Sequence, residues 1–151
     1  MKPLTPPPFA PNGAAGLLAT GEDAHPAIVW HDGHVGYGAL RDAVARAEAV
    51  WRAHGLRPGG RVAVRLPDGI DWVLAWLGAV WAGGVAVGVT PRLSPSEWRD
   101  LLEASRFDLV VTDAGDDTPA AWRGLCIDPD TARGERLSAG PLAAEPMAAD
   151  A

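Results

Sequence analysis

The sequence predicts an α/β fold with a mostly parallel sheet and crossover helices, preceded by a β-hairpin. A β-branched run at Val62–Leu66 is followed by an apolar helical segment at Asp68–Ala82 and a second apolar run at Val85–Val89. A strand, a crossover helix and another buried strand form the βαβ unit of a parallel sheet. Upstream, an Asp-Gly pair between two short apolar runs is typical of a hairpin.

The hairpin is expected to join strands at Ala27–Trp30 and Val35–Tyr37 through the residues His31-Asp32-Gly33-His34. Asp32 and Gly33 are predicted at the centre of the turn, because the favoured two-residue turns require a positive φ at both central positions.

An amphipathic helix is predicted from Gly38 to His54, with one face in solvent. Its apolar residues recur at steps of three and four, and they are Leu40, Ala43, Val44, Ala47, Val50 and Trp51. Gly55 is expected to end the helix in the left-handed conformation, with Pro58 just beyond it.

The next helix, Asp68–Ala82, is predicted to begin with Asp68 as its cap and Asp71 at the third helical position. Apolar side chains occupy nearly its whole circumference, and they are Ile70, Trp72, Val73, Leu74, Trp76, Leu77, Val80 and Trp81. A helix of this kind must be covered on all sides. We therefore expect the chain to leave part of this helix bare, unless it self-associates or binds a chain that supplies the missing part of the fold.

The third helix has the clearest start signal in the sequence. Ser94-Pro95-Ser96-Glu97 places a hydroxyl at the N-cap, proline at the first position and glutamate at the third, which is a complete capping box. Beyond it, Phe107–Thr112 is predicted as a strand, Pro119–Trp122 as a turn and Leu125–Asp128 as the last strand.

One domain is expected from 151 residues, since typical domains contain about 100 to 150 residues. We expect residues 1–20 to form a loose arm rich in Pro, Gly and Ala, residues 21–130 to form the α/β domain, and residues 131–151 to form a flexible tail.

Composition excludes several classes of function. The net charge of −6 and the absence of a basic cluster argue against binding to nucleic acid or to an anionic membrane. The single cysteine, Cys126, excludes a disulfide framework and fits a reducing cytoplasm. The N-terminal residues lack the apolar stretch of a secretory signal, and Gly83-Gly84 interrupts the long apolar stretch Trp72–Val89, which argues against a transmembrane span.

The candidate site is the loop Thr90-Pro91-Arg92-Leu93, because ligands bind at the carboxyl ends of strands in open parallel sheets. Arg92 would lie beside the free amides and the positive end of the third helix, an arrangement suited to a phosphate group. The alternative is a solvated surface arginine.

Other clusters are given structural interpretations. The glycines Gly83, Gly84 and Gly88 do not form a dinucleotide loop, and they are expected to end a helix and to admit close packing. His31 and His34 are interpreted as hairpin polar residues and not as metal ligands. Trp72 and Trp76 are expected to stack one turn apart, with Trp81 near the helix end, either in the core or at an aromatic pocket or interface.

The segment Arg57–Trp98 also resembles a known family, the adenylate-forming acyl-CoA synthetases, and among them the aryl-CoA (benzoate-type) ligases. The resemblance rests on Gly55-Leu56-Arg57-Pro58-Gly59-Gly60-Arg61-Val62-Ala63, Pro67-Asp68, Gly83-Gly84-Val85-Ala86-Val87 and Pro91-Arg92-Leu93 followed by Glu97. Thr90 stands where the family has asparagine. The resemblance extends from about His25 to Asp113.

This resemblance implies an intact enzyme that binds ATP and Mg²⁺, forms an acyl-adenylate from a carboxylate, and transfers the acyl group to coenzyme A. It also implies that Arg92 is a candidate contact for the coenzyme A phosphates. The chain contains no phosphate loop, and its only lysine is Lys2. We therefore expect no catalytic residues, no metal ligands and no cofactor of its own in this chain, which resembles the opening piece of a ligase. The alternative is a non-catalytic α/β interaction module that pairs with a partner chain.

Overall fold

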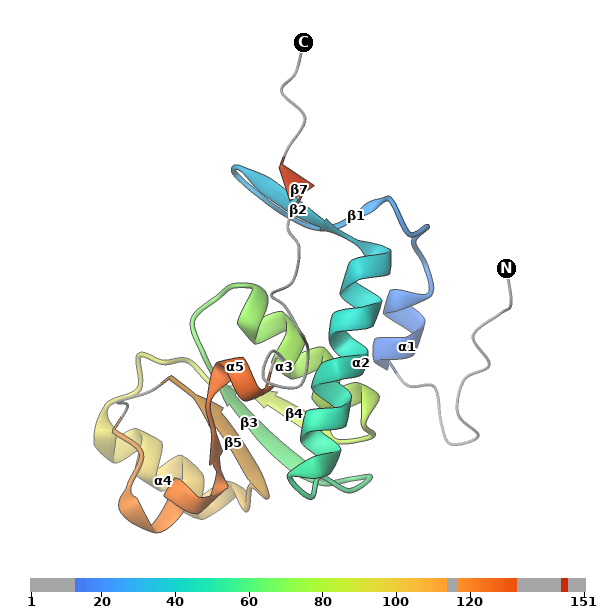
Figure 1. The fold of residues 1–151 in the computed structure, drawn as a ribbon. Coiled ribbons are helices and arrows are strands. Elements are labelled where there is room, and N and C mark those ends of the chain that lie inside the picture. Colours follow the sequence, from blue (N-terminus) through green and yellow to red (C-terminus); the bar gives the residue numbers. More distant parts are fainter. Residues whose placement is uncertain (1–12, 114–116, 133–144, 147–151) are drawn as a thin grey trace.

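Two sheets and the helices around them make up the part of the chain that the computed structural model describes, which is residues 13–113, 117–132 and 145–146 (Figure 1). The parallel sheet has the order β4-β3-β5-β6. Its strands are β3 (Arg61–Arg65), β4 (Val85–Gly88), β5 (Leu109–Thr112) and β6 (Cys126–Ile127). This sheet and the hairpin that precedes it confirm the predicted α/β fold.

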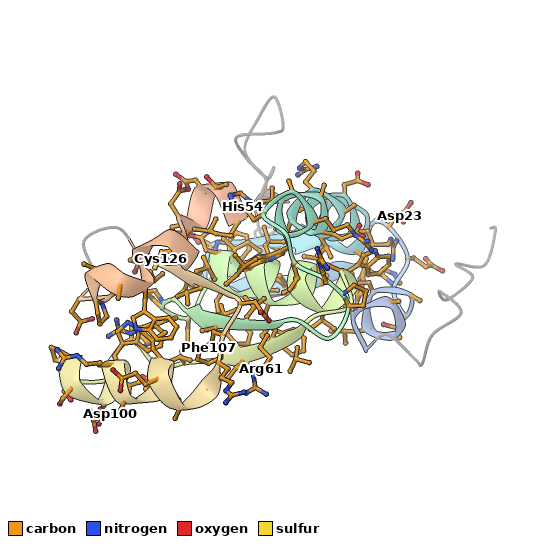
Figure 2. The ribbon with its side chains drawn as sticks, turned by 90° about the horizontal axis from the view of Figure 1, so that it is seen from below. Asp23, His54, Arg61, Asp100, Phe107 and Cys126 are labelled. Carbon is orange, nitrogen blue, oxygen red and sulfur yellow. The ribbon has the colours of Figure 1, made fainter. Side chains whose placement is uncertain are left out.

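Helices cover both faces of the parallel sheet. Figure 2 shows α4 (Pro95–Ser105) on one side of the sheet, and α3 (Ile70–Trp81) on the other with α2 (Tyr37–Ala53) beyond it. Alternate residues of β3 face opposite ways, so that Val62 and Val64 lie in the core cluster with α3, whereas Ala63 packs with Trp98 and Leu102 of α4. Two short helices, η1 (Ala120–Leu125) and α5 (Pro129–Ala132), precede and follow β6 in the sequence.

The helix α3 lies in the middle of the fold, as its apolar surface requires. It contacts α1, α2 and α5 as well as β3 and β4. Each of its residues is buried or half-buried. The bare apolar surface expected on this helix is therefore limited to half-buried side chains, namely Ile70, Trp72, Val73, Trp76, Val80 and Trp81.

The start of α3 differs from the prediction. The N-cap residue is Gly69, not Asp68, and the cap makes no side-chain hydrogen bond. The backbone at Gly69 is extended, with φ 160° and ψ −174°, and this places Asp68 one residue outside the capping position. Asp71 is consequently the second helical residue and not the third.

The hairpin is confirmed, but its turn is one residue earlier than predicted. Strands β1 (Pro26–Trp30) and β2 (Gly33–Gly36) are antiparallel, and Trp30 pairs with Gly33, so that His31 and Asp32 form the turn. Neither Asp32 nor Gly33 has a left-handed φ. Gly33 has a packing role instead, because a Cβ atom there would lie 3.0 Å from the indole ring of Trp30.

Ordered segments occur within both predicted loose ends. Residues 13–18 form α1 (Gly13–Leu18), which buries Ala14 and Leu18. Arg41 of α2 holds the end of this helix by donating to the carbonyl oxygens of Leu18, at 2.6 Å, and Gly21, at 3.1 Å. Near the other terminus, β7 (Glu145–Pro146) pairs with β2. The remainder of both predicted ends, residues 1–12, 133–144 and 147–151, lies outside the described residues, and the domain boundaries stay a prediction.

Helix ends follow the glycine signals in the sequence. All six residues predicted for the buried stripe of α2 are buried. Gly55 and Gly83, which follow α2 and α3, have the left-handed φ values of 91° and 87°. Among the described residues, no helix is long and apolar enough to cross a membrane.

Candidate ligand site at the carboxyl edge of the sheet

The parallel register gathers three loops at one edge of the sheet. Val64 of β3 pairs with Gly88 of β4, and Arg65 pairs with Thr112 of β5. The residues that follow these strands therefore emerge side by side. Two pockets open there, and both include Pro91.

The first pocket contains Arg92 and has a volume of about 660 Å³. It is lined by Leu66, Pro67, Asp68, Trp72, Gly88, Val89, Thr90, Pro91 and Arg92. The indole of Trp72 lies against Gly88, where a Cβ atom would be 3.1 Å from the Trp72 ring. The predicted close packing at Gly88 is thus confirmed, and the residue packed against it is an aromatic side chain of the pocket.

Arg92 is exposed at this pocket. Its backbone N–H donates to Oγ1 of Thr90 at 3.2 Å, so the threonine hydroxyl closes the turn locally. Within the described part of the chain, no ion pair or side-chain hydrogen bond occupies the Arg92 guanidinium. The structure thus places the predicted residue in a pocket with its charge available to an anion.

The second pocket, of about 310 Å³, is lined in part by Arg65, a residue that the sequence analysis did not single out. Arg65 is 5% exposed. Its Nη1 donates to Asp117 Oδ1 at 2.6 Å, its Nη2 lies 3.4 Å from the Pro91 oxygen and 3.3 Å from the Leu93 oxygen, and its Cζ lies 4.9 Å from the centroid of the Trp98 ring. One signal was available in the sequence: an arginine interrupts the apolar run Val62–Leu66, at a position that shares a strand face with Ala63.

The start of α4 confirms the predicted capping box, which occupies two of the backbone N–H groups there, those of Ser94 and Glu97. The Ser94 Oγ accepts from the Glu97 N–H at 3.3 Å, and the Ser94 N–H donates to Glu97 Oε2 at 2.8 Å. Hydrogen bonds from the hydroxyl and the backbone of Ser94 lower the pKa of Glu97. Because Pro95 has no N–H and a carboxylate already occupies the positive helix end, an anion here would be held mainly by Arg92.

The remaining candidates do not form a polar site. Trp72 and Trp76 stack with their centroids 6.1 Å apart and an interplanar angle of 11°, as predicted. The half-buried Cys126 lies in β6, where its Sγ donates to the Trp122 oxygen at 3.6 Å. Figure 2 shows Arg61 and Phe107 at the α4 side of the sheet, with the Arg61 Cζ 6.0 Å from the ring centroid. Among the described residues, no group of three or more His, Cys, Asp or Glu side chains is arranged to hold a metal ion.

Two known ligases are similar to this chain in sequence. The chain is 38% identical over 97 residues to 3-hydroxybenzoate–CoA ligase of Aromatoleum sp. (strain CIB), a match that covers 64% of this chain and 18% of the ligase. It is 36% identical over 93 residues to 4-hydroxybenzoate–CoA/benzoate–CoA ligase of Rhodopseudomonas palustris, covering 62% of this chain and 17% of that ligase. The chain thus spans less than a fifth of the length of these relatives.

Solved structures show the same fold at lower identity. O-succinylbenzoate coenzyme A synthetase of Bacillus subtilis, in complex with ATP and magnesium, matches with a TM-score of 0.70 at 22% identity, over 88% of this chain and 35% of that chain. The N-terminal subdomain of NpsA from Klebsiella oxytoca matches with a TM-score of 0.67 at 17% identity, over 80% and 31% of the two chains. A sequence model described as AMP-binding enzyme matches residues 18–146. The chain therefore belongs to the AMP-binding enzyme family.

Proposed function

We propose that this chain forms the opening part of the adenylation domain of an ATP-dependent aryl- or acyl-CoA ligase. The intact enzyme would join a carboxylate to ATP, giving an acyl-adenylate and pyrophosphate, and would then form a thioester with coenzyme A. Family membership and the two benzoate-type relatives support this proposal. A cytoplasmic location, which the single cysteine favours, is part of it.

The chain by itself is inactive in this proposal. Adenylation requires cations that offset the charge developing on the phosphates. The described residues contain no lysine and no cluster of metal ligands. We therefore propose no ATP or Mg²⁺ site among the described residues and assign them no step of adenylation.

The contribution of this chain to ligand binding is a coenzyme A phosphate contact at Arg92. The single observation that carries this assignment is the exposed guanidinium at a pocket of about 660 Å³ on the carboxyl edge of the sheet, with no ion-pair partner among the described residues. A guanidinium is suited to phosphate because its donors match two phosphate oxygens at once.

Titration of the chain with coenzyme A by calorimetry tests this contact. Arg92→Ala should weaken binding about tenfold, the loss expected for one charge-assisted hydrogen bond of about 1.5 kcal/mol. Arg99→Ala, which removes an exposed arginine from α4, is the matched control and should leave the affinity unchanged. Equal affinities for the wild type and Arg92→Ala would reject Arg92 as a phosphate contact.

A second candidate function is a non-catalytic module that binds a partner chain or a second copy of itself. The half-buried tryptophans of α3 favour it, because such side chains are common at interfaces. Reading the DNA just downstream of the codon for Ala151 separates the two candidates. An adjacent phosphate-loop motif in any frame would support the ligase, and its absence would favour the independent module.

A further inference from the structure

Arg65 contacts the backbone of the loop that carries Arg92. One of its terminal nitrogens, Nη2, is placed between two carbonyl oxygens, at 3.4 Å from Pro91 and 3.3 Å from Leu93. These are the residues immediately before and after Arg92. A contact on each side restricts the backbone from which the Arg92 side chain projects.

Two further contacts hold the Arg65 guanidinium in place. The other terminal nitrogen is ion-paired with Asp117 at 2.6 Å, and the guanidinium lies over the Trp98 ring at 4.9 Å. The indole N–H of Trp98 donates in turn to Oγ1 of the buried Thr118 at 3.0 Å. The network therefore ties the end of β3 to α4, to the residues near Asp117 and to the loop around Arg92.

The burial of the Arg65 guanidinium requires an explanation, because the neighbouring buried residues of β3 are apolar. Removing a guanidinium from water costs free energy, and ion pairs rarely offset that cost better than apolar packing does. A leucine would fill the space beside Trp98 but could not bind two carbonyl groups. What arginine adds here is a fixed loop geometry.

We propose that Arg65 is a positioning residue for Arg92, which it holds in place for an anionic ligand by binding the carbonyl groups on either side of it. This inference rests on the proposed function of Arg92 as a phosphate contact. Lysine cannot replace Arg65, since an ammonium group lacks the planar fork that reaches Asp117 and the loop together.

The molecule contains a matched control for this inference. Arg41 also donates to two carbonyl oxygens, those of Leu18 and Gly21, pairs with an aspartate, Asp23, and lies 5.9 Å from an aromatic ring, that of Tyr37. It anchors α1 and makes no contact at the pocket of Arg92. Arg41→Lys therefore reports the general effect of losing such an arginine.

A double-mutant cycle with coenzyme A as the probe tests the inference. Arg65→Lys should weaken binding about tenfold in the wild-type background and less than twofold in the Arg92→Ala background, because its effect passes through Arg92. Arg41→Lys should change the affinity less than twofold. The inference is overturned if Arg65→Lys leaves the affinity unchanged, if it weakens binding equally in both backgrounds, or if Arg41→Lys weakens it to the same extent. If Arg65→Lys fails to fold, Asp117→Asn, which removes the negative charge paired with Arg65, takes its place in the cycle.

The backbone dynamics of the free chain separate this inference from the proposed function. In the wild type, the order parameters of Arg92 and Leu93 should be near the value of about 0.85 that is typical of rigid backbone, and in Arg65→Lys they should fall below about 0.6. Arg41→Lys should leave them unchanged. Unchanged order parameters in Arg65→Lys would overturn the inference whether or not coenzyme A binds. A rigid loop in a wild type that fails to bind coenzyme A would reject the proposed function alone.

Discussion

Ser94 and Glu97 show how two residues can fix both the start of a helix and the charge beside a ligand loop. Their side chains each satisfy the backbone N–H of the other. The pattern is local in the sequence, so the capping box was predictable without any knowledge of the fold. Arg65 differs in this respect, because its partners at Asp117 and Leu93 are 52 and 28 residues away.

Ser94→Ala should destabilise the chain by about 1 kcal/mol, the usual loss for an N-cap hydroxyl. Urea denaturation measures it, and the control is Ser105→Ala at the other end of α4, which should have little effect. An unchanged midpoint with an unchanged slope for Ser94→Ala would mean that α4 does not depend on this cap.

Glu97 should make the stability of the chain depend on acid. Its pKa is lowered in the folded state by the hydroxyl and then the backbone of Ser94. A lowered folded pKa gives a stabilisation that is complete above the ordinary glutamate value of about 4.3 and is lost as the pH falls through the folded pKa.

Comparison of the wild type with Glu97→Gln by denaturation at a series of pH values checks this dependence. The difference in unfolding free energy should be constant above about pH 5 and should shrink on acidification. In the Ser94→Ala background the difference above about pH 5 should be smaller, because the main cause of the shift is gone. A difference that stays the same down to low pH would contradict this account.

The apolar circumference of α3 predicted a helix that needs cover on all sides and that this chain would leave partly bare. The helices α1, α2 and α5 and the sheet supply much of that cover, and six apolar side chains of α3 remain half-buried. Its start was mispredicted, because Asp68 has the right residue type but the extended backbone at Gly69 moves it out of the capping position. Local sequence showed that a cap residue was available, whereas the path of the chain decided whether it was used.

Gly78 lets α3 approach α2. A Cβ atom on Gly78 would lie 2.6 Å from the Cβ of Ala47, closer than real side-chain atoms come. Gly78→Ala should therefore destabilise the chain by about 1 to 3 kcal/mol through overpacking, which outweighs the gain of up to about 1 kcal/mol in helix propensity.

Gly16→Ala is the matched control for this prediction. Gly16 lies within α1, and nothing stands within 4 Å of a Cβ atom added there. The substitution should therefore be stabilising, by about 0.5 to 1 kcal/mol. Thermal or urea denaturation of the two variants checks the pair, and a stabilising Gly78→Ala would show that the two helices are farther apart than described.

At the scale of the whole molecule, periodicity in the sequence predicted the order of strands and helices, and with it the edge where Arg92 lies. The helix at residues 13–18 needed long-range geometry. It packs against α2 and α3, and Arg41 donates to the Leu18 oxygen at its end. The shift of the hairpin turn depends on the pairing of Trp30 with Gly33, which the Asp-Gly pair did not indicate.

The half-buried tryptophans of α3 lead us to propose that the chain self-associates or binds a partner. Trp72, Trp76 and Trp81 should report this association, with emission that moves to shorter wavelength as the concentration rises or a partner binds. Sedimentation equilibrium provides the independent measurement. A monomer at all concentrations that binds no hydrophobic dye would show that the fold closes on itself.

We propose that this member of the AMP-binding enzyme family supplies the opening part of a ligase and not its chemistry. The most direct test is carboxylate-dependent exchange of pyrophosphate into ATP by the purified 151-residue chain, measured with benzoate, hydroxybenzoates and fatty acids. We predict no exchange above background, because the only lysine is Lys2 and no phosphate loop is present. Exchange that depends on any of these acids and exceeds the background would contradict the account.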